Sequence, residues 1–555
     1  MKNTRKFAAM IAALTLSACS IAPMAMTASA ATTVTIKVAA NDVDTVNHTY
    51  AIYQIFTGKY EKAEGAAPTL TALQWGSGVS GKTGAVDTND EAYKALISED
   101  TDTDSRTKIK TFIATLGTLT NATTATVGED GNIKATLDDG YYYIVDTTEL
   151  ADGTGTVEGD SKDIYDAKSA IMVTIVGGET QNITVKKARP SVDKQIEDNE
   201  EATESGYDGS GFNESADHAI NETFQFKLTA TIPADADIAA YDYYYLGFKD
   251  TFSEGVTFEQ VDKIVIGGTK EITKENTEDW AKWTVPTSVT NNSFEVTTND
   301  IKAQIPTASD WGKKEIKVEV YYSAHLNEDA KVFKQGTDAS GTSDTNQNYV
   351  SLEYSSNPEN TGNGTSKPEE TKETPKDYVW AFTYEVDNTK IDAATKKILA
   401  GAEFTLKKGD TVINLIDNED GTYTVAKQDA TEGIVSKLVS DNNGKFNIIG
   451  LDAGEYTLTE TEAPKGYALP TGAEATTSFT VDANHKEVVD GTKTELKFNN
   501  DKNAAPANTI ENSFKSSLPS TGGMGTTIFY LGGGAMVAVA GVFLITKKRM
   551  GKSEN

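Results

Sequence analysis

A lysine, a carboxylic acid and an asparagine fall on apolar strand faces in the C-terminal third of this 555-residue chain. Alternate side chains of a strand share a face. Lys390 shares its face with Phe382, Tyr384 and Val386. Glu460 shares its face with Tyr456 and Leu458, and Asn512 shares its face with Ile510 and Phe514. Asn500 alternates with Leu496 and Phe498 and is the alternative amide. Apolar surroundings lower the pKa of a lysine and raise that of an acid. The set therefore combines a potential nucleophile, an acid that keeps its proton, and an amide.

A second set of the same composition precedes it. Lys194 alternates with Val192 and Ile196, and Asn348 alternates with Val350, Leu352 and Tyr354. Two acids qualify by the same rule, Asp250 in "LGFKDTF" and Glu222 in "NETFQFKL". Both sets require strands that turn these polar side chains into a core.

The composition favours such strands. Thr, Asp, Gly, Tyr and Val are plentiful and long helical stretches are rare, which is typical of all-β modules. The length allows three or four domains. A formal net charge of −31 argues against nucleic acid or anionic lipid as a partner, because both bind basic surfaces.

The N-terminus has the pattern of an export signal. Lys2, Arg5 and Lys6 precede a short apolar run, and "ASA" ending at Ala30 fits cleavage there, so residues 1–30 are a predicted signal peptide. The alternative is a lipoprotein box, "LSAC", with a lipidated Cys19. After cleavage at Ala30 the only cysteine is lost, and no disulfide can form.

The C-terminus combines a pentapeptide, an apolar run and a basic tail. The pentapeptide is Leu518, Pro519, Ser520, Thr521 and Gly522. Ile528 to Ile545 is long enough for a membrane helix, and Lys547, Lys548 and Arg549 follow it. The arrangement resembles the LPxTG cell-wall sorting signal of Gram-positive surface proteins. That resemblance implies cleavage by a sortase between Thr521 and Gly522, with attachment to peptidoglycan.

The chain between the two ends divides into three regions. Residues 31–187 contain "HTYAIYQIFTGKY", which resembles the N-terminal domain of sortase-assembled pilins, and a predicted helix at "DEAYKALIS". Residues 188–358 form the second region, and the Pro/Gly/Glu/Thr-rich residues 359–377 are a predicted linker. Residues 378–516 contain "LDAGEYTLTETEAPKGYAL", which closely resembles a Cna-B domain, and residues 517–555 are the sorting signal. The expected fold is all-β: immunoglobulin-like (Cna-type) sandwiches in a linear array, with an N-terminal signal peptide and a C-terminal membrane helix.

The resemblance to pilins implies a role for each set. Such domains form spontaneous Lys–Asn isopeptide bonds with help from a buried acid. The implied bonds are Lys194–Asn348, with Asp250 or alternatively Glu222, and Lys390–Asn512, with Glu460. Asn512 is favoured over Asn500 because the family's asparagine lies in the last strand. The lysine that accepts the next subunit is expected at the junction of the first two domains, where Lys186 and Lys187 are both candidates, although the family's Tyr-Pro is missing there.

Conventional enzyme motifs are missing from the sequence. The four histidines are scattered, and no zinc-protease, serine-hydrolase or phosphate-binding motif occurs, so we expect no enzyme, cofactor or metal. The leading hypothesis is the structural backbone subunit of a covalent surface pilus. Its partners would be a sortase, neighbouring pilin subunits and peptidoglycan, with any host receptor unknown. The alternative is a monomeric wall-anchored adhesin or a pilus-tip protein.

Overall fold

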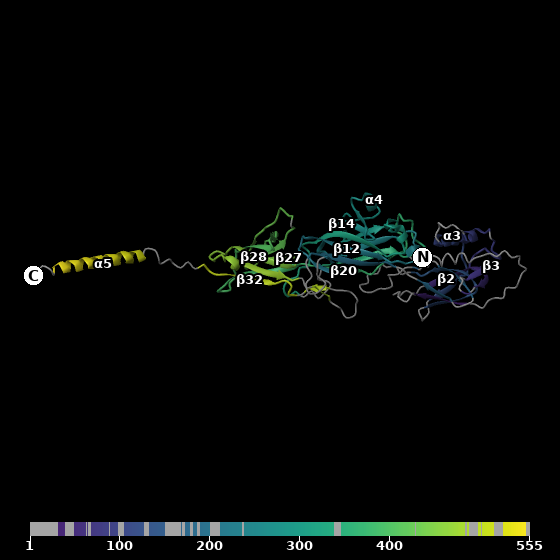
Figure 1. Cartoon of the computed structure of the whole chain (residues 1–555), viewed down its shortest axis with the longest axis horizontal. Helices are drawn as coiled ribbons and strands as arrows, with labels where there is room; N and C mark the ends of the chain where they lie inside the picture. Colours follow the sequence, from purple (N-terminus) through teal and green to yellow (C-terminus); the bar gives the residue numbers. More distant parts are fainter. Residues whose placement is uncertain are drawn as a thin grey trace.

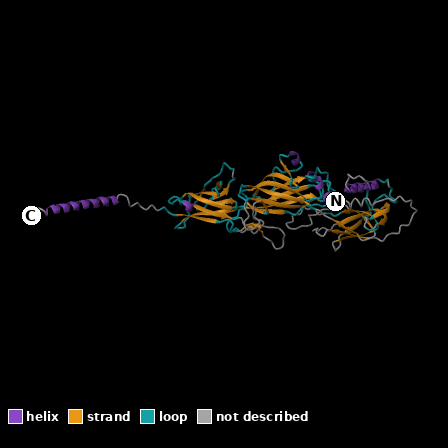
Figure 2. Ribbon diagram, in the orientation of Figure 1, coloured by secondary structure: helices purple, strands orange, loops and turns teal. Residues whose placement is uncertain are grey.

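The chain forms a row of β domains that ends in a separate helix (Figure 1). The structure is a computed structural model. It describes residues 32–550 except for internal gaps, the longest of which are 39–48, 98–104, 150–167, 200–210, 338–345, 488–497 and 516–524. Strands dominate every domain, and the described helices are short apart from the C-terminal one (Figure 2). The all-β prediction is confirmed.

The described residues of the first domain form two sheets and two helices. Its strands are β1 (Thr32–Val38), β2 (Thr49–Glu61), β3 (Thr69–Trp75), β4 (Thr123–Thr126), β5 (Asn132–Leu137), β6 (Gly140–Asp146), β7 (Met172–Val176) and β8 (Gln181–Val185). One sheet has the order β5-β1-β8 and the other β3-β2-β6-β7, with β4 paired to β2. Helix α2 (Glu91–Ile97) confirms the predicted helix, and α3 (Ser105–Thr115) follows it. Both helices contribute to a core that includes Phe56, Tyr93 and Phe112.

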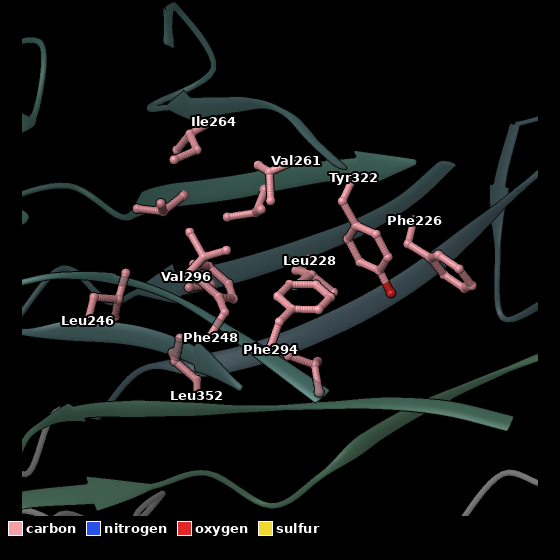
Figure 3. Packing of buried hydrophobic residues seen from close by; sticks show 14 of the residues in the cluster. Phe226, Leu228, Leu246, Phe248, Val261, Ile264, Phe294, Val296, Tyr322 and Leu352 are labelled. Carbon is pink, nitrogen blue, oxygen red and sulfur yellow. The ribbon is translucent and has the colours of Figure 1, made fainter. Parts of the chain in front are cut away.

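The second domain is a sandwich of two six-stranded sheets. One has the order β10-β9-β12-β17-β14-β15 and the other β11-β20-β18-β13-β16, with β19 paired to β18 as its sixth strand. The strands are β9 (Ser191–Asp198), β10 (Gly211–Asn213), β11 (Ser215–Asp217), β12 (Thr223–Ile232), β13 (Leu246–Phe252), β14 (Val256–Ile266), β15 (Lys270–Thr273), β16 (Ser293–Thr298), β17 (Ile316–Leu326), β18 (Asn346–Ser355), β19 (Thr371–Glu373) and β20 (Asp377–Phe382); the short helix α4 (Thr277–Trp280) lies between β15 and β16. Alternating apolar residues of both sheets fill the space between them (Figure 3).

The predicted linker belongs to this sandwich. Within residues 359–377, β19 pairs with β18, and β20 then completes the second sheet between β11 and β18. Asn363 organises the preceding turn by accepting hydrogen bonds from the backbone of Thr365 and Ser366. The second domain therefore extends to Phe382, beyond the expected boundary at residue 358, because backbone pairing and side-chain-stabilised turns order a segment poor in apolar residues.

The third domain is a smaller sandwich that begins at Tyr384. Its strands are β21 (Tyr384–Asp392), β22 (Glu403–Lys408), β23 (Thr411–Val412), β24 (Leu415–Asp417), β25 (Thr422–Val425), β26 (Leu438–Val439), β27 (Asn447–Leu451), β28 (Gly454–Glu462), β29 (Thr476–Val481), β30 (His485–Glu487), β31 (Phe498–Asn500) and β32 (Ala507–Asn512). One sheet has the order β24-β25-β27-β21-β32 and the facing sheet β23-β22-β28-β29. β30 and β31 form a separate two-stranded sheet. Burial alternates strictly along β21, as the sequence pattern predicted.

The second and third domains are joined by specific contacts. The Ile220 amide donates to the Gly450 carbonyl at 3.0 Å, and the Asn221 side chain donates to the Val425 carbonyl at 2.9 Å. Gly450 has a φ of +84°, and a Cβ there would lie 2.7 Å from Ile220. A side chain at this position would therefore clash with Ile220 and force a shift at this contact.

The C-terminal helix α5 (Gly525–Met550) extends away from the sandwiches (Figure 1). Its segment Phe529–Lys548 has a mean hydropathy of 1.9 and none of it is buried within the protein. Twenty residues of helix are about 30 Å long, which matches the hydrocarbon core of a bilayer. The helix agrees with the predicted membrane segment.

Candidate functional site: two buried Lys–acid–Asn clusters

Lys194, Asp250 and Asn348 lie together inside the second domain. Lys194 comes from β9 in one sheet, whereas Asp250 on β13 and Asn348 on β18 come from the facing sheet. Register explains how the last two meet, because Phe252 pairs with Asn348 and Asp250 is two residues away on the same face. The exposed fraction of each of the three residues is at most 1%. Lys194 Nζ contacts Asp250 Oδ2 directly.

A fourth residue, Tyr322 on β17, completes this cluster. Lys194 Nζ and Asn348 Nδ2 lie 3.0 and 2.7 Å from the Tyr322 hydroxyl, which lies 3.1 Å from Asp250 Oδ1. Lys194 Nζ also lies 4.8 Å from the centre of the Phe226 ring, and Figure 3 shows Phe226 and Tyr322 side by side between the sheets. Sequence reasoning missed Tyr322. Its alternation with the buried Val318 and Val320 was the available signal.

Burial sets the protonation of this pair. It lowers the pKa of Lys194, against the opposing effect of the Asp250 charge. It raises the pKa of Asp250, against the opposing effects of Lys194, Tyr322 and Asn348. Both shifts favour the neutral forms, an amine and a carboxylic acid, over the ion pair. A neutral amine next to an amide and an acid is the arrangement that acyl transfer needs.

Lys390, Glu460 and Asn512 lie together in the third domain. β21 and β32 are parallel neighbours, and Lys390 pairs with Ile510 while Asp392 pairs with Asn512. Lys390 Nζ donates to Asn512 Oδ1 at 2.5 Å and lies 3.6 Å from Glu460 Oε2. Asn512 Nδ2 donates to Glu460 Oε1 at 2.6 Å. The acid comes from β28 in the facing sheet and therefore approaches the amide from the opposite side of the core.

The third-domain geometry is close to that of a reactive complex. Because a C=O bond is about 1.2 Å long, Lys390 Nζ lies within about 3.7 Å of the Asn512 carboxamide carbon. Reacting atoms in near-attack conformers are about 3–3.5 Å apart. Burial lowers the pKa of Lys390 and raises that of Glu460. The two clusters therefore share the same electrostatic arrangement.

The alternative residues lie elsewhere. Glu222 precedes β12, and its carboxylate accepts hydrogen bonds from the Asn199 side chain and the Ala219 amide. Asn500 is on β31, which pairs with β30 in the small sheet separate from β21 and β32. The acceptor candidates Lys186 and Lys187, residues 518–522 and the predicted signal peptide with Cys19 lie outside the described residues.

Two family models match parts of the chain. Residues 384–495 match the SpaA family, described as a prealbumin-like fold domain, and residues 510–550 match the LPXTG cell wall anchor motif. No curated protein matches the chain significantly.

Similar solved structures include two pilins. The T6 backbone pilin of serotype M6 Streptococcus pyogenes is 16% identical, with 89% of this chain and 100% of that chain covered and a TM-score of 0.47. The full-length major pilin SpaD from Corynebacterium diphtheriae is 16% identical, with the same two coverages and a TM-score of 0.45.

The match to the LPXTG anchor motif confirms the predicted sorting signal. The third sandwich, expected to be a Cna-B domain, matches the SpaA family of prealbumin-like fold domains. The chain is a cell-wall-anchored surface protein that carries a prealbumin-like fold domain of the SpaA family and an LPXTG cell wall anchor motif.

Proposed function

We propose that this protein is the backbone subunit of a covalent surface pilus, joined to its neighbours and to peptidoglycan by a sortase and cross-linked internally by two Lys–Asn isopeptide bonds. The observation that carries the proposal is the pair of buried Lys–acid–Asn clusters in successive domains of a wall-anchored chain. A lone surface protein has little need for two irreducible cross-links, whereas every subunit of a fibre bears the whole tension.

The bond-forming step follows from the third-domain contacts. The neutral Lys390 amine attacks the Asn512 carboxamide carbon, and a new C–N bond forms while the carbonyl oxygen gains negative charge. Glu460, in contact with Asn512 Nδ2, gives its proton to that nitrogen and receives one from Lys390. The C–N bond to Nδ2 then breaks and ammonia leaves. The products are one secondary amide, one ammonia and the same protonated acid.

The positions of the bonds suit a tensile element. In the third domain the bond would join β21, the first strand, to β32, the last described strand before the anchor. In the second domain it would join the first strand, β9, to β18 near the end of that domain. Force entering at one end would pass through each amide instead of separating strands one at a time.

Assembly is tested by boiling wall extracts in detergent and blotting them for this protein. A covalent polymer gives a ladder of high-molecular-weight bands. A single band of subunit size would contradict the backbone proposal and indicate the alternative, a monomeric wall-anchored adhesin. Deleting the responsible sortase should convert the ladder to monomer.

The sorting motif makes a separate prediction about the mature end. We expect mass spectrometry of wall-released protein to identify Thr521 as the last residue of this chain, amide-linked to the next group. The reason is that the motif, the apolar helix and the basic tail occur in the required order. A mature protein that retained Phe529–Lys548 would refute sortase processing.

The acceptor lysine makes a further prediction. Replacing both Lys186 and Lys187 by arginine keeps the positive charge but removes every acylatable amine at this junction. The ladder should collapse to monomer that is still attached to the wall through Thr521. Each single Lys→Arg variant serves as a control that identifies the acceptor. A normal ladder from the double variant would place the acceptor elsewhere in the chain.

A further inference from the structure

Tyr322 uses the full hydrogen-bonding capacity of its hydroxyl within the second-domain cluster. A phenol has one proton to donate and two lone pairs that accept. In the structure it accepts from Lys194 Nζ at 3.0 Å and from Asn348 Nδ2 at 2.7 Å, and it donates to Asp250 Oδ1 at 3.1 Å. The hydroxyl therefore touches the nucleophile, the leaving nitrogen and the acid at once.

The third domain arranges the same three functions differently. There the acid itself contacts the leaving nitrogen, because Glu460 Oε1 lies 2.6 Å from Asn512 Nδ2. In the second domain the corresponding short contact of the leaving nitrogen, at 2.7 Å, is to the phenol oxygen of Tyr322. A shorter acid, Asp250, which also interacts with the Asn348 side chain, thus coincides with an additional hydroxyl that contacts both the acid and the amide.

We propose that Tyr322 is a catalytic residue of the second domain, which carries the proton from Asp250 to the leaving nitrogen of Asn348. This inference rests on the proposed function, because it presupposes that the Lys194–Asn348 bond forms. It assigns the two domains different routes to the same product: direct acid catalysis by Glu460 and a two-residue relay through Asp250 and Tyr322.

Every proton in the relay has a donor and an acceptor within the cluster. Lys194 attacks the Asn348 carboxamide carbon and gives a proton to Asp250, which it already contacts. Tyr322 gives its proton to Asn348 Nδ2 and regains one from Asp250, which reverses the hydrogen bond between those two side chains. Ammonia leaves, and the phenol and the acid return to their starting forms. Burial raises the pKa of Tyr322 well above its usual range, so the phenol is neutral before and after the reaction.

In the other orientation of the Asn348 amide, Tyr322 would act on the carbonyl oxygen instead of on the leaving nitrogen. Asn348 Oδ1 is buried without a hydrogen-bond partner, whereas Nδ2 contacts Tyr322. A half turn of the amide exchanges the two atoms with little change of shape and places Oδ1 against the hydroxyl. Tyr322 would then donate to the carbonyl oxygen, where negative charge develops during the attack. In both orientations the phenol is in contact with the amide.

The experiment compares bond formation in the full chain during cell-free synthesis. Samples are quenched in acid at intervals and digested, and the cross-linked peptides of both domains are quantified. Tyr322→Phe removes the hydroxyl and keeps the ring. We expect it to slow the Lys194–Asn348 bond by about 10²-fold or more, the usual contribution of a positioned proton donor. The Lys390–Asn512 bond in the same molecules should form at the wild-type rate and provides an internal control.

Two further variants separate proton transfer from packing. Tyr321→Phe changes the neighbouring tyrosine, which packs on the opposite face against Lys263 and Phe212, and should leave both rates unchanged. Incorporating 3-fluorotyrosine at 322 keeps the shape and the hydroxyl but makes the phenol more acidic, and should change the rate and its pH profile. A wild-type rate in Tyr322→Phe, or an unchanged rate with 3-fluorotyrosine, would overturn the relay. Absence of the Lys194–Asn348 peptide from the wild type would instead refute the proposed cross-link itself.

Discussion

Replacing Asp250 by alanine is expected to abolish the second-domain cross-link and to lower the midpoint of thermal unfolding of that domain by roughly 10–20 °C. The bond would close a loop of about 150 residues, and removing such a closure costs about 5 kcal/mol of unfolding free energy on the chain-entropy account. The variant also removes the carboxyl group that Lys194 contacts and leaves the amine with no acid to receive its proton. Calorimetry of the full chain should show the unfolding transition of the second domain at a lower temperature and that of the third domain unchanged.

Two variants control this experiment. Asn348→Ala removes the acyl donor but keeps the Lys194–Asp250 pair, so it isolates the contribution of the bond. Glu222→Ala removes the alternative acid, which is partly exposed and bonded to Asn199 and Ala219. It should keep the bond. Loss of the bond in Glu222→Ala and its retention in Asp250→Ala would mean that the acid is assigned to the wrong residue.

The second large effect is expected from Glu460→Ala. Alanine cannot carry the proton to Asn512 Nδ2, so the third-domain bond should fail to form while the second-domain bond remains. After correction for the substitution, the intact mass should rise by about 17 Da, the mass of the one ammonia that is retained. Peptide mapping should then recover Lys390 and Asn512 in separate, unmodified peptides.

The matched pair for this variant is Asn512→Ala and Asn500→Ala. The first removes the amide that Lys390 contacts at 2.5 Å and should lose the bond. The second changes an asparagine in the separate β30–β31 sheet and should keep it. The opposite outcome would transfer the role of acyl donor to Asn500.

Strand alternation correctly placed four of the predicted polar residues in a core. Lys194, Asp250, Lys390 and Asn512 are all at least nine-tenths buried, because period-two patterns leave an internal strand little choice of face. Alternation could not choose between Asp250 and Glu222, since both were in phase with apolar residues. The choice depends on register across strands, which places Asp250 beside Asn348. Register is a long-range property that one strand does not encode.

The same limit explains Tyr322 and the linker. Adjacent tyrosines 321 and 322 were both visible in the sequence, but only the three-strand register β9–β12–β17 places Tyr322 near Lys194. Residues 359–377 were predicted to be a linker from their composition. Their order comes from pairing of β19 and β20 with β18, which uses the backbone groups that all residues except proline carry in full.

The most direct test of the account is the intact mass of the full chain, followed by identification of its cross-linked peptides. Two isopeptide bonds release two molecules of ammonia, so we predict a mass about 34 Da below that calculated from the processed sequence, with Lys194 joined to Asn348 and Lys390 joined to Asn512. A mass equal to the calculated value, with all four residues in unmodified peptides, would contradict the central claim.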